Sequence, residues 1–156
     1  MRIGLGFDAH AFDDARPLVL GGVTIPDSPG LAGHSDADVV SHALADALLG
    51  AAGLGDLGDR FPASSEWKDA SSLEILRRCV EELTSSGWSV VNVDVTVVAE
   101  RPRVASFRHE MIKTLANALG LTADSVSVKA TSTDGMGFTG RGEGIAALGV
   151  ALIEPR

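Results

Sequence analysis

The chain has 156 residues, of which 45% are hydrophobic, 22% are charged and only 4% are aromatic. This composition excludes intrinsic disorder and coiled coils, and the length favours one globular domain over residues 1–156. The net charge of −8 argues against binding to nucleic acid or to an anionic membrane, because such partners need a basic surface. Glycine is enriched: 18 glycines make up about 12% of the chain, against an average of about 7%. This excess predicts backbone brought close to another group.

The single cysteine and the short apolar runs narrow the cellular setting. Cys79 has no partner for an intramolecular disulfide and cannot belong to a multi-cysteine zinc site. The N-terminal residues lack the pattern of a signal peptide, and no uncharged apolar stretch approaches about 18 residues. We therefore expect a cytoplasmic protein without a membrane span.

The first third of the chain predicts a strand, a hairpin and a helix. Apolar residues alternate along residues 2–9, as they do in a β-strand. Residues 18–20 and 23–25 are separated by a glycine pair, which is typical of a hairpin. Residues 37–52 have the apolar periodicity of a helix, and a glycine follows them.

The rest of the chain alternates helices with strands. The predicted elements are a helix from Ser71 to Gly87, a strand over 88–98, a helix between Arg103 and Gly120, and strands over 125–130 and about 143–153. Ser71 and Glu74 match a capping box at the start of the first of these helices. No helix is predicted between the last two strands. The fold class that follows is α+β (an α/β two-layer): a mixed sheet of about four strands with helices on one face, plus a small β-hairpin.

Asp8, His10 and His42 form the first candidate site. Asp8 and His10 are two residues apart at a strand end, so their side chains leave the same face, and His42 lies on the following helix. A carboxylate with two imidazoles suits Zn²⁺, which keeps a fourth position open in catalytic sites. Asp38 or Asp46, four residues either side of His42, is a candidate to orient its imidazole. The alternative is a strand-end histidine bonded to a helix cap, with unrelated surface carboxylates.

The glycine-rich run KATSTDGMGFTGRGEG, residues 129–144, is the second candidate site. Its hydroxyls, its glycine N–H groups and its arginine together suit a phosphate cradle, although the Walker lysine is missing. The alternating Gly140, Gly142 and Gly144 predict a strand face without side chains, packed closely against other backbone at a subunit contact. The alternative is a mobile glycine loop followed by a tightly packed strand.

Two further segments contain candidate binding residues, and two known functional motifs are absent. Arg103 follows the central strand and is a candidate phosphate partner, with a solvated helix N-terminus as the alternative. Asp56 lies in a turn suited to sugar hydroxyls, although a simple connecting loop would look similar. A serine hydrolase is disfavoured because no G-x-S-x-G elbow exists. A dinucleotide fingerprint fails because Ala9 takes its third glycine position.

Three motifs together resemble the 2-C-methyl-D-erythritol 2,4-cyclodiphosphate synthase family: GFDAH, HSDADVVSHALADALLGAAGLGDLG and KATSTDGMGFTGRGEGIA. The resemblance covers essentially the whole chain. It implies a phosphorus–oxygen lyase of the non-mevalonate isoprenoid route, which cyclises 4-diphosphocytidyl-2-C-methyl-D-erythritol 2-phosphate and releases CMP. It also implies Zn²⁺, a second ion that is Mg²⁺ or Mn²⁺, and a homotrimer with active sites between subunits and the sheets around its centre.

The resemblance assigns roles to individual residues. The three candidate metal ligands match the zinc ligands, His34 and Ser132 match residues that stabilise the transition state, and Asp134 matches the ligand of the second ion. Ser132, Asp134 and Arg103 stand where the family usually has threonine, glutamate and lysine. The residues that match substrate contacts are Ser35, Asp56, Gly58, Phe61, Ala99, Arg103, Ala130, Thr131, Phe138 and Arg141.

The implied reaction needs no protein nucleophile, because the 2-phosphate of the substrate attacks its own β-phosphorus. Positioning within one molecule can supply up to roughly 7–11 kcal/mol of the barrier in favourable cases. Two rivals stay open from the residues alone. One is a zinc phosphohydrolase, which would make a linear bisphosphate, and the other is a non-catalytic trimer that binds a nucleotide or a metal.

Overall fold

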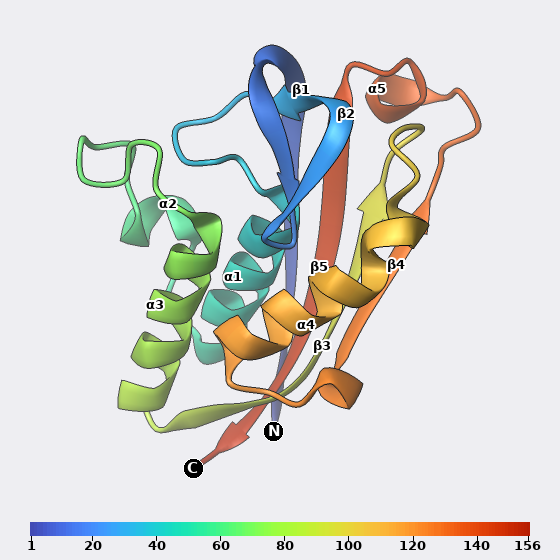
Figure 1. The fold of residues 1–156 in the computed structure, drawn as a ribbon. Helices are drawn as coiled ribbons and strands as arrows, with labels where there is room; N and C mark the ends of the chain where they lie inside the picture. Colours follow the sequence, from blue (N-terminus) through green and yellow to red (C-terminus); the bar gives the residue numbers. More distant parts are fainter.

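A computed structural model describes all of residues 1–156. Its strands form one mixed five-stranded sheet in the order β2-β1-β5-β3-β4 (Figure 1). The strands are β1 (Arg2–Leu20), β2 (Val23–Leu31), β3 (Trp88–Val98), β4 (Val126–Thr131) and β5 (Gly144–Pro155). Neighbouring strands are antiparallel except β3 and β4, which are parallel. The expected α+β class is confirmed, with five strands because the long β1 carries the hairpin strand β2 into the same sheet.

Three long helices cover one face of this sheet, and Figure 1 shows them on the same side. The helices are α1 (Val39–Ala52), α2 (Leu57–Arg60), α3 (Ser72–Ser85), α4 (Arg108–Leu119) and α5 (Gly137–Gly140), with 3₁₀ turns over Val104–Phe107 and Ala123–Ser125. Most residues of α1 are buried, because it lies between the sheet and α3. It starts two residues later than predicted, since Asp38 caps its N-terminus. Ser71 precedes α3 but makes no side-chain cap bond, so the predicted capping box does not form.

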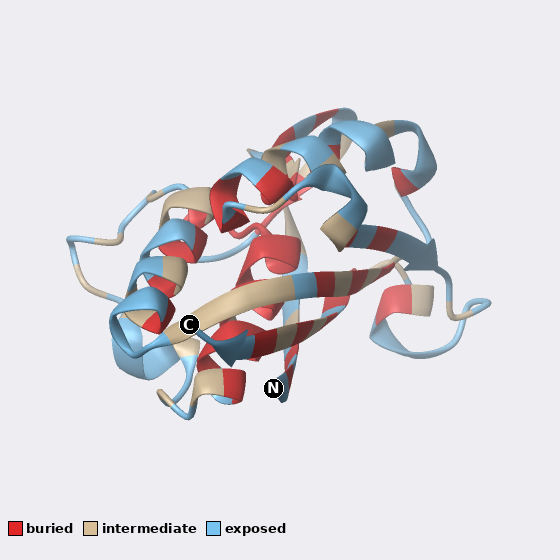
Figure 2. Ribbon diagram, turned by 90° about the horizontal axis from the view of Figure 1, so that it is seen from below, coloured by how far each residue is buried: buried red, intermediate tan, exposed pale blue.

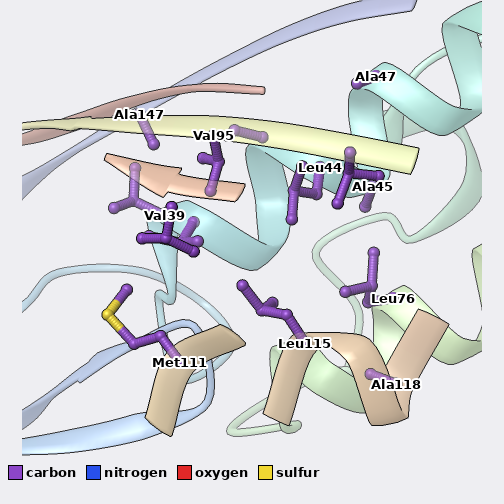
Figure 3. Packing of buried hydrophobic residues seen from close by; sticks show 14 of the residues in the cluster. Val39, Leu44, Ala45, Ala47, Leu76, Val95, Met111, Leu115, Ala118 and Ala147 are labelled. Atoms are coloured by element: carbon purple, nitrogen blue, oxygen red, sulfur yellow. The ribbon is translucent and has the colours of Figure 1, made fainter. Parts of the chain in front are cut away.

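The hydrophobic core fills the layer between the sheet and the helices. Figure 2 shows buried positions alternating along the strands and lining the inner sides of the helices. Figure 3 shows side chains from α1, α3, α4, β3 and β5 meeting there, among them Leu44, Leu76, Val95, Leu115 and Ala147. No helix is long and apolar enough to cross a membrane.

Helix α1 rests directly on the backbone of β1. A Cβ atom built on Gly4 would lie 1.9 Å from the carbonyl oxygen of Ala47, and one on Gly6 would lie 2.0 Å from that of Ala43. No side chain fits between the two elements at these positions. The glycine excess is therefore used here for close approach of a strand and a helix.

The predicted strand face of alternating glycines is wrong. Gly140 lies in α5 and Gly142 in the turn after it, so only Gly144 belongs to β5. Glycine at every second residue is the spacing of one face of a strand. Here a short helix and a turn contain the first two of these glycines, so the spacing does not reflect a strand. A Cβ atom on Gly144 would lie 2.2 Å from the carbonyl oxygen of His10, so close backbone packing does occur there, inside the chain.

The opposite face of the sheet is open and carries large apolar side chains. Ile3, Leu5 and Phe7 point away from the helices and are 71%, 66% and 57% exposed. Leu148 of β5, which pairs with Phe7, is also exposed. A contiguous apolar surface of this kind marks a contact with another molecule.

Cys79 lies in the core, where burial raises the pKa of its thiol to about 12. Since the thiolate is the reactive form, we expect the native chain not to react with a disulfide reagent near about pH 8. One thiol per chain should react after unfolding in concentrated guanidinium chloride. Rapid labelling of the native chain would contradict this packing.

Candidate active site

Asp8, His10 and His42 converge on one point, as predicted. Asp8 and His10 project from the helix-facing side of β1, and His42 lies in the first turn of α1. The Oδ2 atom of Asp8 lies 2.9 Å from Nε2 of His10 and 2.9 Å from Nδ1 of His42, and these two nitrogens are 3.3 Å apart. Zinc in tetrahedral coordination holds its donors roughly 3.3–3.6 Å apart, so this donor set fits the ion with little adjustment.

The electrostatics of the cluster favour a cation. Burial alone would raise the pKa of Asp8, but hydrogen bonds with His10 and His42 outweigh it and hold the pKa well below its ordinary value. Burial would likewise lower the pKa of His10, and the bond to Asp8 overrides this and raises it. The carboxylate of Asp8 is therefore ionised, as a metal ligand must be, whereas a metal that binds His10 must displace the proton that Asp8 favours there.

The second nitrogen of His42 has hydroxyl partners. Its Nε2 lies 2.9 Å from Oγ of Ser72 and 3.1 Å from Oγ of Ser35. The predicted orienting residues do other work: Asp46 accepts from the backbone N–H of Leu57, and Asp38 bonds elsewhere. Ser72 escaped prediction because it comes from α3, and no local spacing links it to His42.

Asp38 joins the glycine turn of the β1–β2 hairpin to the start of α1. Its fully buried carboxylate accepts from the backbone N–H groups of Gly21, Gly22, Val40 and Ser41, and from the hydroxyl of Ser41. Burial raises its pKa, although these bonds oppose the rise. Asp38 therefore fixes the helix that carries His42, by a route that does not touch the imidazole.

Asp38→Ala should lower the free energy of unfolding by about 3–5 kcal/mol, because several buried donors lose their acceptor at a cost of about 1–3 kcal/mol each. Asp46→Ala is the matched control: it removes one acceptor from Leu57 and should cost about 1 kcal/mol or less. Urea denaturation followed by circular dichroism measures both values. Equal losses for the two variants would contradict the role given to Asp38.

Two cavities flank the metal cluster and bring several predicted substrate residues together. The first, of about 240 Å³, is lined by the cluster with His34, Ser35 and Phe61. The second, of about 230 Å³, contains Asp56 and Gly58 beside Asp8 and His42. Asp56 also caps α2 by accepting from the N–H of Asp59 at 2.9 Å. The two cavities share Asp8 and His42, so a ligand on the metal could extend into either.

Hydrogen bonds that were not predicted from the sequence hold the segment around His34 in place. Both terminal nitrogens of Arg16 donate to backbone carbonyl oxygens, one to Gly33 and the other to Ser35. Nε2 of His34 lies 2.5 Å from the carbonyl oxygen of Ser64, in the loop that precedes α3. His34 is thus held at the rim of the first cavity by backbone anchors on both sides.

A third cavity, of about 240 Å³, gathers the residues predicted to bind cytidine and diphosphate. Its lining includes Ala99, Arg103, Ala130, Thr131 and Ser132, at the carboxyl ends of β3 and β4.

The turn after this cavity carries Asp134 and is held by Glu100. One carboxylate oxygen of Glu100 accepts from the N–H groups of Thr133 and Gly135, both at 3.2 Å. Oγ of Ser132 lies 3.2 Å from Oδ1 of Asp134. The sequence did not predict this contact of Glu100, because its partners lie more than thirty positions away in the chain.

The two halves of the predicted site do not meet within one chain. His34 lines the first cavity and Ser132 the third, and the two linings share no residue. Phe138 and Arg141 are exposed, and Nε of Arg141 donates to Glu143 at 2.7 Å. Figure 1 shows the loop before α3 and the segment of α5 on opposite sides of the same end of the molecule. Within this chain the two halves therefore line separate cavities.

Comparisons with known proteins point to one family. The YgbB family model matches residues 1–154. A 2-C-methyl-D-erythritol 2,4-cyclodiphosphate synthase of Desulfatibacillum aliphaticivorans is 52% identical over 155 residues, which are 99% of this chain and 100% of that protein. The bifunctional IspDF of Campylobacter jejuni is 40% identical with a TM-score of 0.95 over 99% of this chain, which spans only 42% of that longer protein.

A structure with bound nucleotide is also similar. The IspF of Plasmodium falciparum, solved as a CDP complex, is 30% identical with a TM-score of 0.86, and the match covers 99% of this chain and 96% of that one. Agreement in family model, whole-length identity and fold leads to one conclusion: the chain belongs to the YgbB family, that of the 2-C-methyl-D-erythritol 2,4-cyclodiphosphate synthases.

Proposed function

We propose that this protein converts 4-diphosphocytidyl-2-C-methyl-D-erythritol 2-phosphate to 2-C-methyl-D-erythritol 2,4-cyclodiphosphate and CMP, in non-mevalonate isoprenoid biosynthesis. The observation that carries the proposal is the Asp8–His10–His42 cluster, whose three donor atoms lie within 4.8 Å of one another at the meeting of two cavities. The names of the relatives and the CDP in a similar structure support it. In the reaction, an oxygen of the 2-phosphate bonds to the β-phosphorus, and the bond between that phosphorus and the oxygen bridging to the α-phosphate breaks.

Asp8, His10 and His42 would hold Zn²⁺, which when bound acts as a Lewis acid on phosphoryl oxygens. The rest of the chemistry is positioning by the chain itself. His34 would donate a hydrogen bond to the charge that develops on the reacting phosphates. Ser35, beside it, presents its hydroxyl and its backbone to the same cavity.

The methylerythritol part would lie in the second cavity and the nucleotide in the third. The carboxylate of Asp56 can accept from sugar hydroxyls, beside the small Gly58. Arg103 would pair with the diphosphate, with Ser132 as a hydroxyl donor to it. Asp134 is the candidate ligand for a second Mg²⁺ or Mn²⁺ because its carboxylate is exposed next to Ser132.

The assembly that joins these cavities is a homotrimer, with the open faces of the sheets turned toward its centre. The exposed Ile3, Leu5 and Phe7 support this arrangement, as does the separation of the two half-sites within one chain. Each active site would then combine the metal cluster of one copy with the nucleotide cavity of its neighbour.

Leu5→Asp should therefore convert the trimer to monomers and abolish CMP release, because three carboxylates would be buried together near the axis. Light scattering coupled to size exclusion measures the mass. Asn117→Asp adds the same charge at an exposed position on α4 and should change neither property. A Leu5→Asp chain that stays trimeric would remove this face from the interface.

The function itself is tested by incubating the zinc-loaded protein with the diphosphocytidyl substrate and identifying both products by mass spectrometry. CMP together with the cyclic diphosphate supports the proposal. A linear bisphosphate would indicate a zinc phosphohydrolase, and CDP binding without CMP release would indicate a binding protein. Either of these results would overturn the synthase assignment.

A further inference from the structure

A carboxylate lies behind the metal cluster, one hydroxyl away from His42. Ser72 is fully buried at the start of α3, and its hydroxyl donates to Oδ1 of Asp36. The same oxygen of Ser72 lies 2.9 Å from Nε2 of His42. At the other end of the imidazole, Nδ1 faces Asp8 at 2.9 Å. The imidazole of His42 therefore lies between two carboxylates, one in direct contact and one acting through Ser72.

The number of available protons determines which atom donates in each of these hydrogen bonds. A serine hydroxyl has one proton, and an ionised carboxylate can only accept. Asp36 is the stronger acceptor because it is charged, so it takes the proton of Ser72. The Ser72 oxygen then presents lone pairs to His42, and Nε2 must carry the proton that makes the contact a hydrogen bond. A neutral imidazole with its proton on Nε2 has its free lone pair on Nδ1, which faces the metal position.

The anchoring of Asp36 makes this arrangement rigid. Its second oxygen accepts from the backbone N–H of Ser72 at 3.0 Å, and its own N–H donates to the carbonyl oxygen of Ala70. The Oγ atom of Ser35 also lies near this nitrogen, 3.1 Å from Nε2 of His42, and accepts from the backbone N–H of Ala37.

We infer that Asp36 and Ser72 are positioning residues that keep the proton of His42 on Nε2, so that Nδ1 is free to ligate the metal. This inference rests on the proposed function for the metal cluster itself. It replaces the direct carboxylate contact that Asp38 or Asp46 was expected to make. Loss of the carboxylate should act like loss of the hydroxyl, since without Asp36 the hydroxyl of Ser72 can turn its proton toward Nε2.

The test measures zinc affinity by chelator competition for the wild-type chain and four variants. Ser72→Ala and Asp36→Asn should each weaken zinc binding about 10- to 100-fold, the usual loss when a partner of a metal-bound histidine is removed. The double variant should be no weaker than the worse single one, because both residues act through one contact. Ser71→Ala, at the exposed neighbouring serine that makes no cap bond, should bind zinc as the wild type does.

A second measurement needs no variant. In zinc-loaded wild-type protein labelled with ¹⁵N-histidine, the nitrogen shifts of His42 should show a protonated Nε2 and a metal-bound Nδ1. A proton on Nδ1, or unchanged zinc affinity in both variants, would overturn the inference while leaving the metal centre in place. A wild-type protein that binds no zinc would overturn the metal centre and the inference with it. Weakened zinc binding in the variants, together with a failure of the wild type to make the cyclic product, would support the inference and refute only the proposed reaction.

Discussion

Replacing His42 by alanine is expected to abolish zinc binding and CMP release together. The substitution removes Nδ1, which lies 2.9 Å from the carboxylate of Asp8 and 3.3 Å from Nε2 of His10. Zinc would keep two protein donors, fewer than the three that catalytic sites provide. Since a metal contributes several kcal/mol to the stabilisation of transferring phosphoryl groups, turnover should fall at least about 1,000-fold. Metal analysis after dialysis and chromatography of released CMP measure the two effects.

His109→Ala is the control for this variant, because His109 is an exposed histidine on α4, outside the site. It should retain both zinc and activity. Circular dichroism of the His42→Ala chain distinguishes loss of the ligand from loss of the fold. A folded, metal-free variant that turns over at the wild-type rate would exclude the cluster from the reaction.

Gly6→Ala is expected to cause a large loss of stability for a single added methyl group. The new Cβ atom would lie 2.0 Å from the carbonyl oxygen of Ala43 and 2.6 Å from the nitrogen of Ala47. Both are backbone atoms, so the helix or the strand must move as a whole. Overpacking costs about 1–3 kcal/mol when side chains can adjust, and we expect about 3 kcal/mol or more here. Displacement of α1 should also weaken zinc binding, because His42 lies on that helix.

Gly50→Ala provides the matched control for the added methyl group. Gly50 lies in the same helix, is exposed, and has nothing within 4 Å of a Cβ atom. Alanine is a better helix former than glycine by about 1 kcal/mol, so this variant should be as stable as the wild type or more stable. Denaturant unfolding of both variants measures the difference. A Gly6→Ala chain as stable as Gly50→Ala would show that α1 does not rest on β1.

Local sequence patterns predicted most of the helices and strands, because the signals for these elements lie in short stretches of chain. The hairpin was predicted across the glycine pair, and in the structure Leu20 pairs with Val23 there. Helices α1 and α4 were also predicted to stop at Gly53 and Gly120. In the structure both glycines adopt the left-handed conformation that ends a helix. Each of these features depends on residues within a few positions of one another.

The sidedness of β1 shows what such patterns leave undetermined. Alternation of Ile3, Leu5 and Phe7 identifies a strand, but it does not say which face meets the helices. In the structure the glycines Gly4 and Gly6 face α1 and the large apolar residues face outward. The usual rule that large apolar residues point into the core fails here, because a helix lies too close for any side chain.

The site was predictable where motifs are compact and not where distant elements meet. Asp8, His10 and His42 come from two consecutive parts of the chain, and their convergence follows from a strand and the next helix. Ser72 and Arg16 reach the site through tertiary contacts that have no spacing in the sequence. The roles of the residues in the third cavity stay predictions, because the lining of that cavity shares no residue with the cavity at the metal cluster.

The contact of α1 with the backbone of β1 also sets the dimensions of the metal centre. Gly4 and Gly6 precede Asp8 on the same face of the strand, and α1 carries His42. The distance between the ligands on β1 and the ligand on α1 is thus set by two backbones in direct contact. No side chain lies between them at Gly4 and Gly6. Core substitutions between α1, α3 and α4 can therefore alter stability without changing the distance between the ligands on β1 and the ligand on α1. The spacing of the metal ligands is therefore set by the contact of α1 with β1 and not by the packing of the helices on one another.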